Sequence, residues 1–269
     1  MKKTFKKNNS EISSNKIGTF KSKAPDTRPE RIAKTIARSG LCSRREAERW
    51  IINGQVKLNS KILTECGVNV TSRDLIEVNG KPLPNKAITK LWMYHKQRGY
   101  LVTNYDPEGR STIFDQLKNK AETRFISVGR LDMDSEGLIL LTNDGDLARK
   151  LELPSTGWLR KYRVRVHGYV IPKDLEPLKN GIIIDGIKYG RIDADLDRQQ
   201  GSNAWLTLSF REGKNREVRK VMKHLGYNVN RLIRVSFGPF NLKDLPSGAV
   251  SYTHLRAHET REDRVWRGG

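Results

Sequence analysis

Side chains that could do chemistry are densest between Gly129 and Gly145, in the segment GRLDMDSEGLILLTNDG. A glycine-flanked loop there carries Arg130, Asp132 and Asp134, and an apolar run suited to a buried strand follows it. Catalytic residues are often found on loops that a rigid element holds in place. A carboxylate in such a loop can act as nucleophile or general base, or it can simply accept hydrogen bonds from backbone amides. The loop alone leaves these roles open.

A second charged group lies in FREGKNREVR, from Phe210 to Arg219, and in the residues after it. The pattern predicts a helix that Asn215 caps and that runs to Gly226. Basic residues recur at i, i+3, i+4 and i+7, so they share one helix face. Such a face can bind phosphate or can be a solvated surface. The residues on it are Arg216, Arg219, Lys220 and Lys223.

These residues need a sheet to position them, and the sequence after residue 90 predicts one. Short apolar or alternating runs at 91–95, 138–141, 205–210 and 233–237 are typical of strands. In the run 161–166, Lys161, Arg163 and Arg165 alternate with apolar residues, which predicts a half-buried strand with a basic outer edge. Pro172 is expected to start a helix that reaches Asn180. Residues 81–89, with two prolines, are expected to be a linker.

Residues 29–53 predict two short helices, and strand-like segments follow as far as the Asn79-Gly80 turn. Ser43 and Glu46 are expected to form a capping box at the start of the second helix. A helix-turn-helix fits less well, because the chain turns to strands directly after Gly54. The polar sides of both helices are basic, which suits RNA phosphates or a solvated face. These basic residues are Arg31, Lys34, Arg38, Arg44, Arg45 and Arg49.

The composition favours a polyanionic partner. The 269 residues include 51 Lys and Arg against 30 Asp and Glu, a formal net charge of +21. Nucleic acid is the expected partner, and an anionic membrane surface is the alternative. The sequence has no apolar run long enough to span a bilayer and no secretory signal, so a cytoplasmic location is expected. Cys42 and Cys66 have neither metal-site nor disulfide spacing, and we expect both to be reduced.

The two ends of the chain differ from the rest. Residues 1–28 are rich in Lys, Asn and Ser and are expected to form a disordered basic arm. The segment VSYTHLRAHET, within 250–269, resembles the in-frame translation of a transposase sequencing adapter. We therefore expect residues 250–269 to be a non-native tail outside the fold. Its His254 and His258 are four residues apart but lack a third metal ligand.

Two resemblances bring these observations together. The stretch RIAKTIARSGLCSRREAERWIINGQVKLNSKIL resembles the S4 RNA-binding domain, which implies two helices on a small sheet over about 29–83. The segment 129–145 resembles GRLDxxSEGLLLLTNDG, the signature of the ribosomal RNA pseudouridine synthases. This second resemblance implies an α+β catalytic domain over 84–249, with a mixed, mainly antiparallel sheet. It also implies that Asp132 is the catalytic aspartate, that Tyr162 packs at the target base, and that Arg219 pairs with Asp132.

The reaction implied is the isomerisation of uridine to pseudouridine. It needs no redox cofactor and no metal, and the sequence has no dinucleotide fingerprint, phosphate loop or credible metal cluster. The target base must leave its stack, and Arg130 is expected either to fill the vacated space or to contact phosphate. The motifs are most similar to those of the B-type large-subunit enzymes, so the expected partner is 23S rRNA or the assembling subunit. The protein is expected to be a monomer. The alternatives are 16S rRNA, a non-catalytic assembly factor, or a glycosidase using Asp132 with Asp134.

Overall fold

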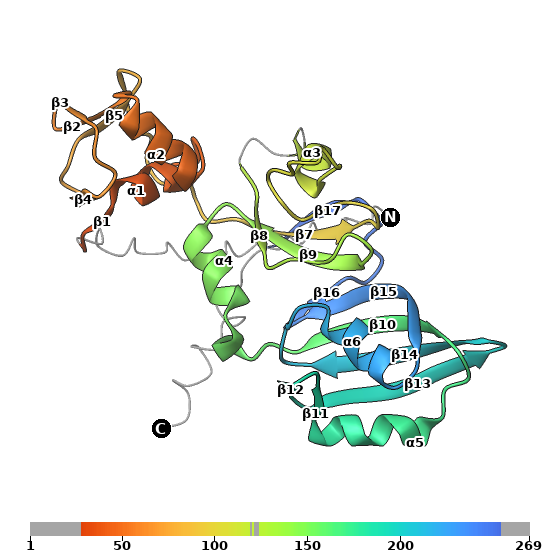
Figure 1. Ribbon diagram of the computed structural model, residues 1–269. Helices are drawn as coiled ribbons and strands as arrows, with labels where there is room; N and C mark the ends of the chain where they lie inside the picture. The colour runs from red at the N-terminus through yellow and green to blue at the C-terminus, as the bar shows by residue number, and fades with distance from the viewer. Residues whose placement is uncertain (1–27, 119, 121–123, 254–269) are drawn as a thin grey trace, which may run out of the picture.

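The computed structural model describes residues 28–118, 120 and 124–253, which form two domains (Figure 1). The other residues of the predicted arm and tail, 1–27 and 254–269, lie outside the described residues, and so do His254 and His258. In the described part of the chain, no helix combines the length and the apolar character needed to cross a membrane.

The first domain has the predicted S4 arrangement, with two helices packed on a small sheet. Its helices are α1 (Ile32–Arg38) and α2 (Arg44–Ile52). A four-stranded sheet runs in the order β3 (Lys61–Leu63), β2 (Val56–Leu58), β5 (Ile76–Val78), β6 (Lys81–Pro82), and β1 (Glu30–Arg31) pairs with β4 (Asn69–Val70). The core is made by apolar residues of both helices and the strands, including Ile32, Ile36, Ile51, Val56 and Val70.

The predicted capping box at the start of α2 forms only in part. The Ser43 hydroxyl accepts a hydrogen bond from the Glu46 amide at 3.1 Å, as expected. The Glu46 carboxylate, however, pairs with Arg49 one turn further along the helix. An Arg at i+3 offers a charged partner, which competes with the backbone amide that a capping box requires.

The second domain is built on one mixed sheet, as the sequence predicted. Its order is β13 (Ile192–Gln200), β14 (Asn203–Phe210), β10 (Arg160–His167), β15 (Asn228–Phe237), β9 (Glu136–Thr142), β7 (Leu91–Lys96), β17 (Val250–Thr253). The strands β8 (Ile126–Val128) and β16 (Phe240–Asn241) pair with β9 and β15. Only the β15–β9 pair is parallel among the described strands. This parallel pair joins the two halves of the sheet.

The helices cover the sheet unevenly. α6 (Glu217–His224) lies over the β10–β14–β15 half, and α5 (Pro172–Leu175) lies at the end of that half, beside the hairpin of β11 (Ile182–Ile184) and β12 (Ile187–Tyr189) (Figure 1). α4 (Gly145–Glu152) and the short η1 helix (Pro154–Thr156) follow β9, and α3 (Ile113–Leu117) lies near β7. In the β10–β14–β15 half, one face packs against α6 in the main core, whereas β9 is buried on both faces, with α4 packed on the face away from that core.

Two predicted helices have different bounds in the structure. The helix from Pro172 stops at Leu175 and continues as a 3-10 segment, η2 (Glu176–Asn180), because Pro177 cannot donate a helical hydrogen bond. Asn215 does not cap the last helix. Instead Arg216 is the N-cap, with a left-handed backbone (φ 50°), and the Glu217 carboxylate accepts from the Lys214 amide at 2.9 Å.

The sheet also continues beyond the predicted boundary at residue 249. Residues 250–253, which the sequence assigned to a non-native tail, form strand β17, paired with β7 from Val250–Tyr94 to Thr253–Leu91. A β-strand is held largely by backbone hydrogen bonds, so a segment with an apolar and β-branched start can extend a sheet whatever its origin.

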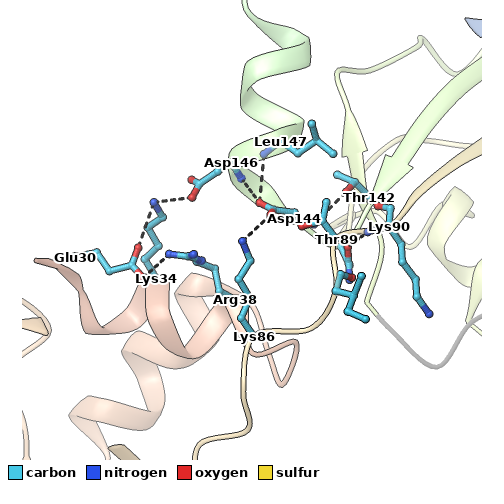
Figure 2. A network of polar contacts seen from close by, with 12 residues as sticks. Glu30, Lys34, Arg38, Lys86, Thr89, Lys90, Thr142, Asp144, Asp146 and Leu147 are labelled. Atoms are coloured by element: carbon cyan, nitrogen blue, oxygen red, sulfur yellow. Dashed lines mark hydrogen bonds and ion pairs between the residues drawn. The ribbon is translucent and has the colours of Figure 1, made fainter. Parts of the chain in front are cut away.

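A polar network joins the two domains (Figure 2). The ammonium of Lys34 in α1 lies 3.4 Å from Glu30 and 2.9 Å from Asp146 at the start of α4. The buried carboxylate of Asp144 caps α4 and pairs with Lys86 of the linker at 3.0 Å. The S4 domain is thus fixed to the helix that directly follows β9.

We expect the Asp144 network to contribute pH-dependent stability. Burial alone would raise the pKa of Asp144, but hydrogen bonds from Lys86 and Thr89 and the charge of Lys86 outweigh it and lower the pKa to about 2. Since the folded pKa is depressed, the stabilisation is present above the unfolded value near 4 and is lost as the pH falls toward 2. Asp144→Asn, which cannot ionise, should remove this dependence.

Urea unfolding of both proteins at pH 5 and pH 2.5 tests this expectation. Wild type should be more stable than Asp144→Asn by about 2 kcal/mol at pH 5, and the difference should shrink at pH 2.5. Asp146→Asn, which changes a half-exposed partner of Lys34, is the matched control and should lose well under 1 kcal/mol. A constant difference between wild type and Asp144→Asn at both pH values would contradict the assignment.

Candidate active site

The acidic loop and the strands around it enclose an open cleft. The loop precedes β9 and closes in a tight turn, in which the Ser135 amide donates to the Asp132 carbonyl at 3.0 Å. The Asp132 and Asp134 side chains are each about one-third exposed. The cleft has a volume of about 1030 Å³ and is lined by residues of the loop, of β10 and β14, and of the turn before α6. The loop therefore presents its carboxylates at a cavity large enough for a nucleotide.

An aromatic pair forms one wall of this cleft. Tyr162 in β10 is only 8% exposed, and its ring stacks on Phe210 of β14 with centroids 5.3 Å apart and planes 3° apart. Both rings line the same cavity as Asp132. The structure thus brings together Asp132 and Tyr162, although 30 positions separate them in the sequence. A flat aromatic face beside a carboxylate suits a planar base.

In this structure Arg219 pairs with Asp134 and not with Asp132, the partner that the resemblance implied. Arg219 Nη2 lies 3.3 Å from Asp134 Oδ2 and donates to the Asp134 carbonyl at 3.0 Å. Its Nη1 donates to the Val229 carbonyl at 3.2 Å, which anchors the guanidinium against β15. The arginine near Asp132 is Arg216, whose Nη1 is 3.4 Å from Asp132 Oδ2 and 3.5 Å from Asp134 Oδ1. One cation thus bridges both carboxylates.

Asp134 is a part of the site that sequence reasoning undervalued. Burial would raise the pKa of its carboxyl, but the charges of Arg219 and Arg216 outweigh burial and hold the pKa below its usual range. Burial lowers the pKa of Arg219 in turn, against the charge of Asp134. The Asp134 carboxylate therefore links the loop to α6. Its position in the variable pair of the signature gave no sign of this role.

Lys96, the last residue of β7, is a second residue that the sequence did not single out. Its side chain is 0% exposed, and Nζ donates to the carbonyls of Ser135 at 2.7 Å, Gln97 at 3.0 Å and Met133 at 3.2 Å. Burial lowers its pKa to about 8, opposed by the nearby charges of Asp134, Asp132 and Glu136. Lys96 therefore holds the backbone of the acidic loop from behind. A lysine at the end of an apolar strand was the available signal.

Comparison with known proteins agrees with this geometry. Residues 90–224 match the RNA pseudouridylate synthase family, and residues 30–76 match the S4 domain. An uncharacterized RNA pseudouridine synthase of Rickettsia bellii is 45% identical over 216 residues, which is 80% of this chain and 93% of that protein. The chain belongs to the RNA pseudouridine synthase family. It is an enzyme that isomerises uridine in RNA.

Further relatives of this synthase extend the agreement to fold and domain organisation. The ribosomal large subunit pseudouridine synthase B of Yersinia pestis is 37% identical over 235 residues, which cover 85% of this chain and 74% of that protein. A crystal structure of a pseudouridylate synthase has a TM-score of 0.58 at 26% identity, covering 83% of this chain and 96% of that one. Each match covers more than four-fifths of this chain.

The basic residues predicted on α6 do not form one continuous face in the synthase. Arg216 lies before the helix and lines the cleft, while Arg219 turns inward to Asp134. Lys223 is exposed and Lys220 is half-buried. Arg130 is exposed at the cleft rim, where it can meet RNA. The predicted helix is present, but its basic residues point in different directions, with Arg219 toward the acidic loop and Lys223 toward the solvent.

The basic residues of the S4 domain also fall into two groups. Lys34 and Arg38 pair with acidic residues, Lys34 with Glu30 and Asp146 and Arg38 with Glu30. The remaining predicted residues are exposed. Among these, Arg31 donates to the Gly67 carbonyl at 2.7 Å, Arg49 pairs with Glu46, and Arg44 and Arg45 extend from the first turn of α2.

Lys96 gives a test of how the loop is positioned. We expect Lys96→Met to lower kcat of the synthase about 10-fold to 100-fold, because the loop carbonyls of Met133 and Ser135 lose their donor and Asp132 is no longer held in place. KM for RNA should change little, since Lys96 is not accessible. The matched control is Lys90→Met, at an exposed residue that directly precedes β7, and this variant should retain wild-type kcat. Equal kcat values for both variants would contradict this role.

Proposed function

We propose that the synthase converts a uridine of 23S ribosomal RNA to pseudouridine, with Asp132 as the catalytic carboxylate. The observation that carries the proposal is that Asp132 and the Tyr162–Phe210 wall line one cleft, beside the cation of Arg216. The choice of large-subunit RNA is supported by similarity to the large subunit pseudouridine synthase B of Yersinia pestis and by the S4 domain.

The reaction requires little from the protein beyond a positioned carboxylate. The bond from ribose C1′ to uracil N1 breaks, the base turns, C5 bonds to C1′, and the C5 proton moves to N1. Uridine and pseudouridine are isomers, so neither an oxidant nor a phosphoryl donor is needed. Asp132 serves either as nucleophile toward the sugar or as base toward a proton, and both roles need it ionised. The Arg216 guanidinium lies 3.4 Å from the Asp132 carboxylate.

The target base reaches this cleft only after leaving its stack. Tyr162, stacked on Phe210, offers a flat apolar surface on which the extruded uracil can lie. Arg130 at the exposed rim fills the space that the base leaves, or binds the adjoining phosphate. Extrusion costs a few kcal/mol in a duplex and less in a loop, where protein reading of RNA sequence is usual. A loop or bulge of the rRNA is therefore the preferred target.

Basic residues outside the cleft bind the flanking RNA in this proposal. Arg44 and Arg45 are exposed at the start of α2 and suit phosphate contacts. Lys34 contributes indirectly, because its ion pair with Asp146 holds the S4 domain against α4, and Arg38 pairs with Glu30, the other partner of Lys34. The remaining proposed contacts are made by Arg31, Arg49, Lys220 and Lys223, and by Arg216 at the cleft itself.

Mapping the modification in cells tests the proposal. Carbodiimide-dependent primer extension on rRNA should show one stop that disappears when the gene is deleted and returns with wild type but not with Asp132→Asn. A stop restored equally by both proteins would remove Asp132 from the mechanism. A lost stop in 16S rather than 23S rRNA would change the substrate, and an unchanged map would support a non-catalytic assembly role.

A further inference from the structure

The face of the sheet that points away from the cleft is unusually basic along β10. Side chains alternate along β10, so that Tyr162 and its alternate neighbours are buried, while Lys161, Arg163, Arg165 and His167 are exposed. The buried set packs with α6 in the main core. The exposed set therefore lies on the opposite side of the sheet, which we call the outer face.

A partly exposed tryptophan lies among these cations. Trp205 of β14 is the cross-strand partner of Arg165, and the Arg163 guanidinium lies over its ring at 4.9 Å. On the other side of β10, Arg165 is opposite Arg231 of β15. The outer face thus combines a stacked Arg163–Trp205 pair with cations on two adjacent strands.

The charges of the outer face are only partly neutralised. Arg231 pairs with Glu136 at 2.8 Å, and Arg163 lies 3.8 Å from Asp197. Lys161 and Arg165, however, form no ion pair with any residue of the described chain. Alternate residues of a strand are roughly 6.6 Å apart, so the positive charges of Lys161, Arg163 and Arg165 repel one another until an anion is bound. A repeated anion, such as a phosphate backbone, is the complementary partner.

We propose that the outer face binds a single-stranded segment of the substrate RNA, on the side of the sheet opposite the cleft. Proteins bind single-stranded RNA with cations that follow its backbone and with aromatic or guanidinium surfaces on which its bases stack. A duplex would hide its bases from the Arg163–Trp205 stack. The proposal requires only that the partner is RNA and does not depend on which residue isomerises uridine.

The acidic strand β13 sets the path of the RNA. Asp195 is exposed there, opposite Thr207 of β14, and Asp193 and Asp197 lie on the same strand. Asp193 pairs with Arg191 and Asp197 lies near Arg163, whereas Asp195 has no ion pair among the described residues. Its carboxylate therefore repels phosphate from this edge, and the RNA follows β10 and β15. Removing a charge therefore has opposite effects at the two positions: losing Lys161 or Arg165 weakens binding, and losing Asp195 strengthens it.

Fluorescence anisotropy with a labelled oligocytidylate of about 20 nucleotides tests this on the full chain. The probe has no uridine, so the result is independent of catalysis. We expect Lys161→Gln with Arg165→Gln to weaken binding about tenfold at 50 mM salt and to reduce the slope of log K against log salt by about 1.4, or about 0.7 for each lost contact. Asp195→Asn should bind more tightly than wild type.

The matched control removes two charges elsewhere. Lys179 of η2 and Lys188 of β12 are exposed on elements that pack on the helix-covered side of the sheet, and Lys179→Gln with Lys188→Gln should leave the affinity within about twofold of wild type. Equal losses in the two double variants, or no loss in either, would overturn the proposal. The proposal would also be overturned if the variant with Lys161→Gln and Arg165→Gln bound RNA normally but lost the binding of a ribosomal protein.

Discussion

Replacing the Asp132 carboxylate by an amide, in Asp132→Asn, is expected to lower kcat for pseudouridine formation by about 10³-fold or more. The amide keeps the shape of the side chain but can neither ionise nor act as a nucleophile or base. Asp132 is about one-third exposed and its nearest cation, Arg216, is half-exposed at 3.4 Å, so folding should not depend on this charge. Purified enzyme with a short rRNA stem-loop and single-turnover kinetics gives the measurement.

Binding and folding measurements show whether the loss lies in chemistry. Asp132→Asn should bind the stem-loop within a few-fold of wild type and should unfold at the same urea concentration. Asp244→Asn, a change of one exposed acid in the same domain, is the matched control and should keep full activity. Substantial turnover by Asp132→Asn would show that another group carries the reaction, and Asp134 is the acid that lies next to it in the cleft.

Substituting Arg219 should have the second largest effect, a fall in kcat of about 10²-fold for Arg219→Met. The variant loses the bonds to Val229 and to both the carbonyl and the carboxylate of Asp134. The loop then lacks its anchor on α6. Arg219→Lys should recover only part of the activity, because an ammonium cannot reproduce the planar, two-sided contact. Quenched single-turnover assays at saturating RNA measure this loss in the chemical step without a contribution from weaker RNA binding.

Asp134→Asn distinguishes the observed pairing from the pairing that the resemblance implied. If Arg219 acts through Asp134, Asp134→Asn should reproduce much of the loss, and the double variant should be little worse than either single variant. If Arg219 instead moves to Asp132 when RNA binds, Asp134→Asn should remain near wild type while Arg219→Met stays impaired. Arg216→Met, at the exposed bridge between both acids, should raise KM more than it lowers kcat.

Much of the fold could be predicted because its signals are local. Alternation in 161–166 places Tyr162 on the buried side and Lys161 on the exposed side of β10, since side chains on a strand alternate strictly. Ser43 caps α2 as the sequence predicted. Helix ends were less certain. Arg216, rather than Asn215, precedes α6, because the Lys214–Glu217 contact sets the turn there.

The sequence by itself determined the family, the two domains, the mixed sheet and the importance of the segment 129–145, because each depends on residue type and spacing along the chain. Tertiary structure alone decided which side chains meet. Asp134, rather than Asp132, lies on Arg219, since Val229 of another strand fixes the guanidinium. Lys96 supports the loop across 39 positions of sequence, through contacts with carbonyls that no residue pattern reveals. The contact of Lys34 with Asp146, which joins the two domains, could not be predicted either, because the two residues lie close together only in the folded chain.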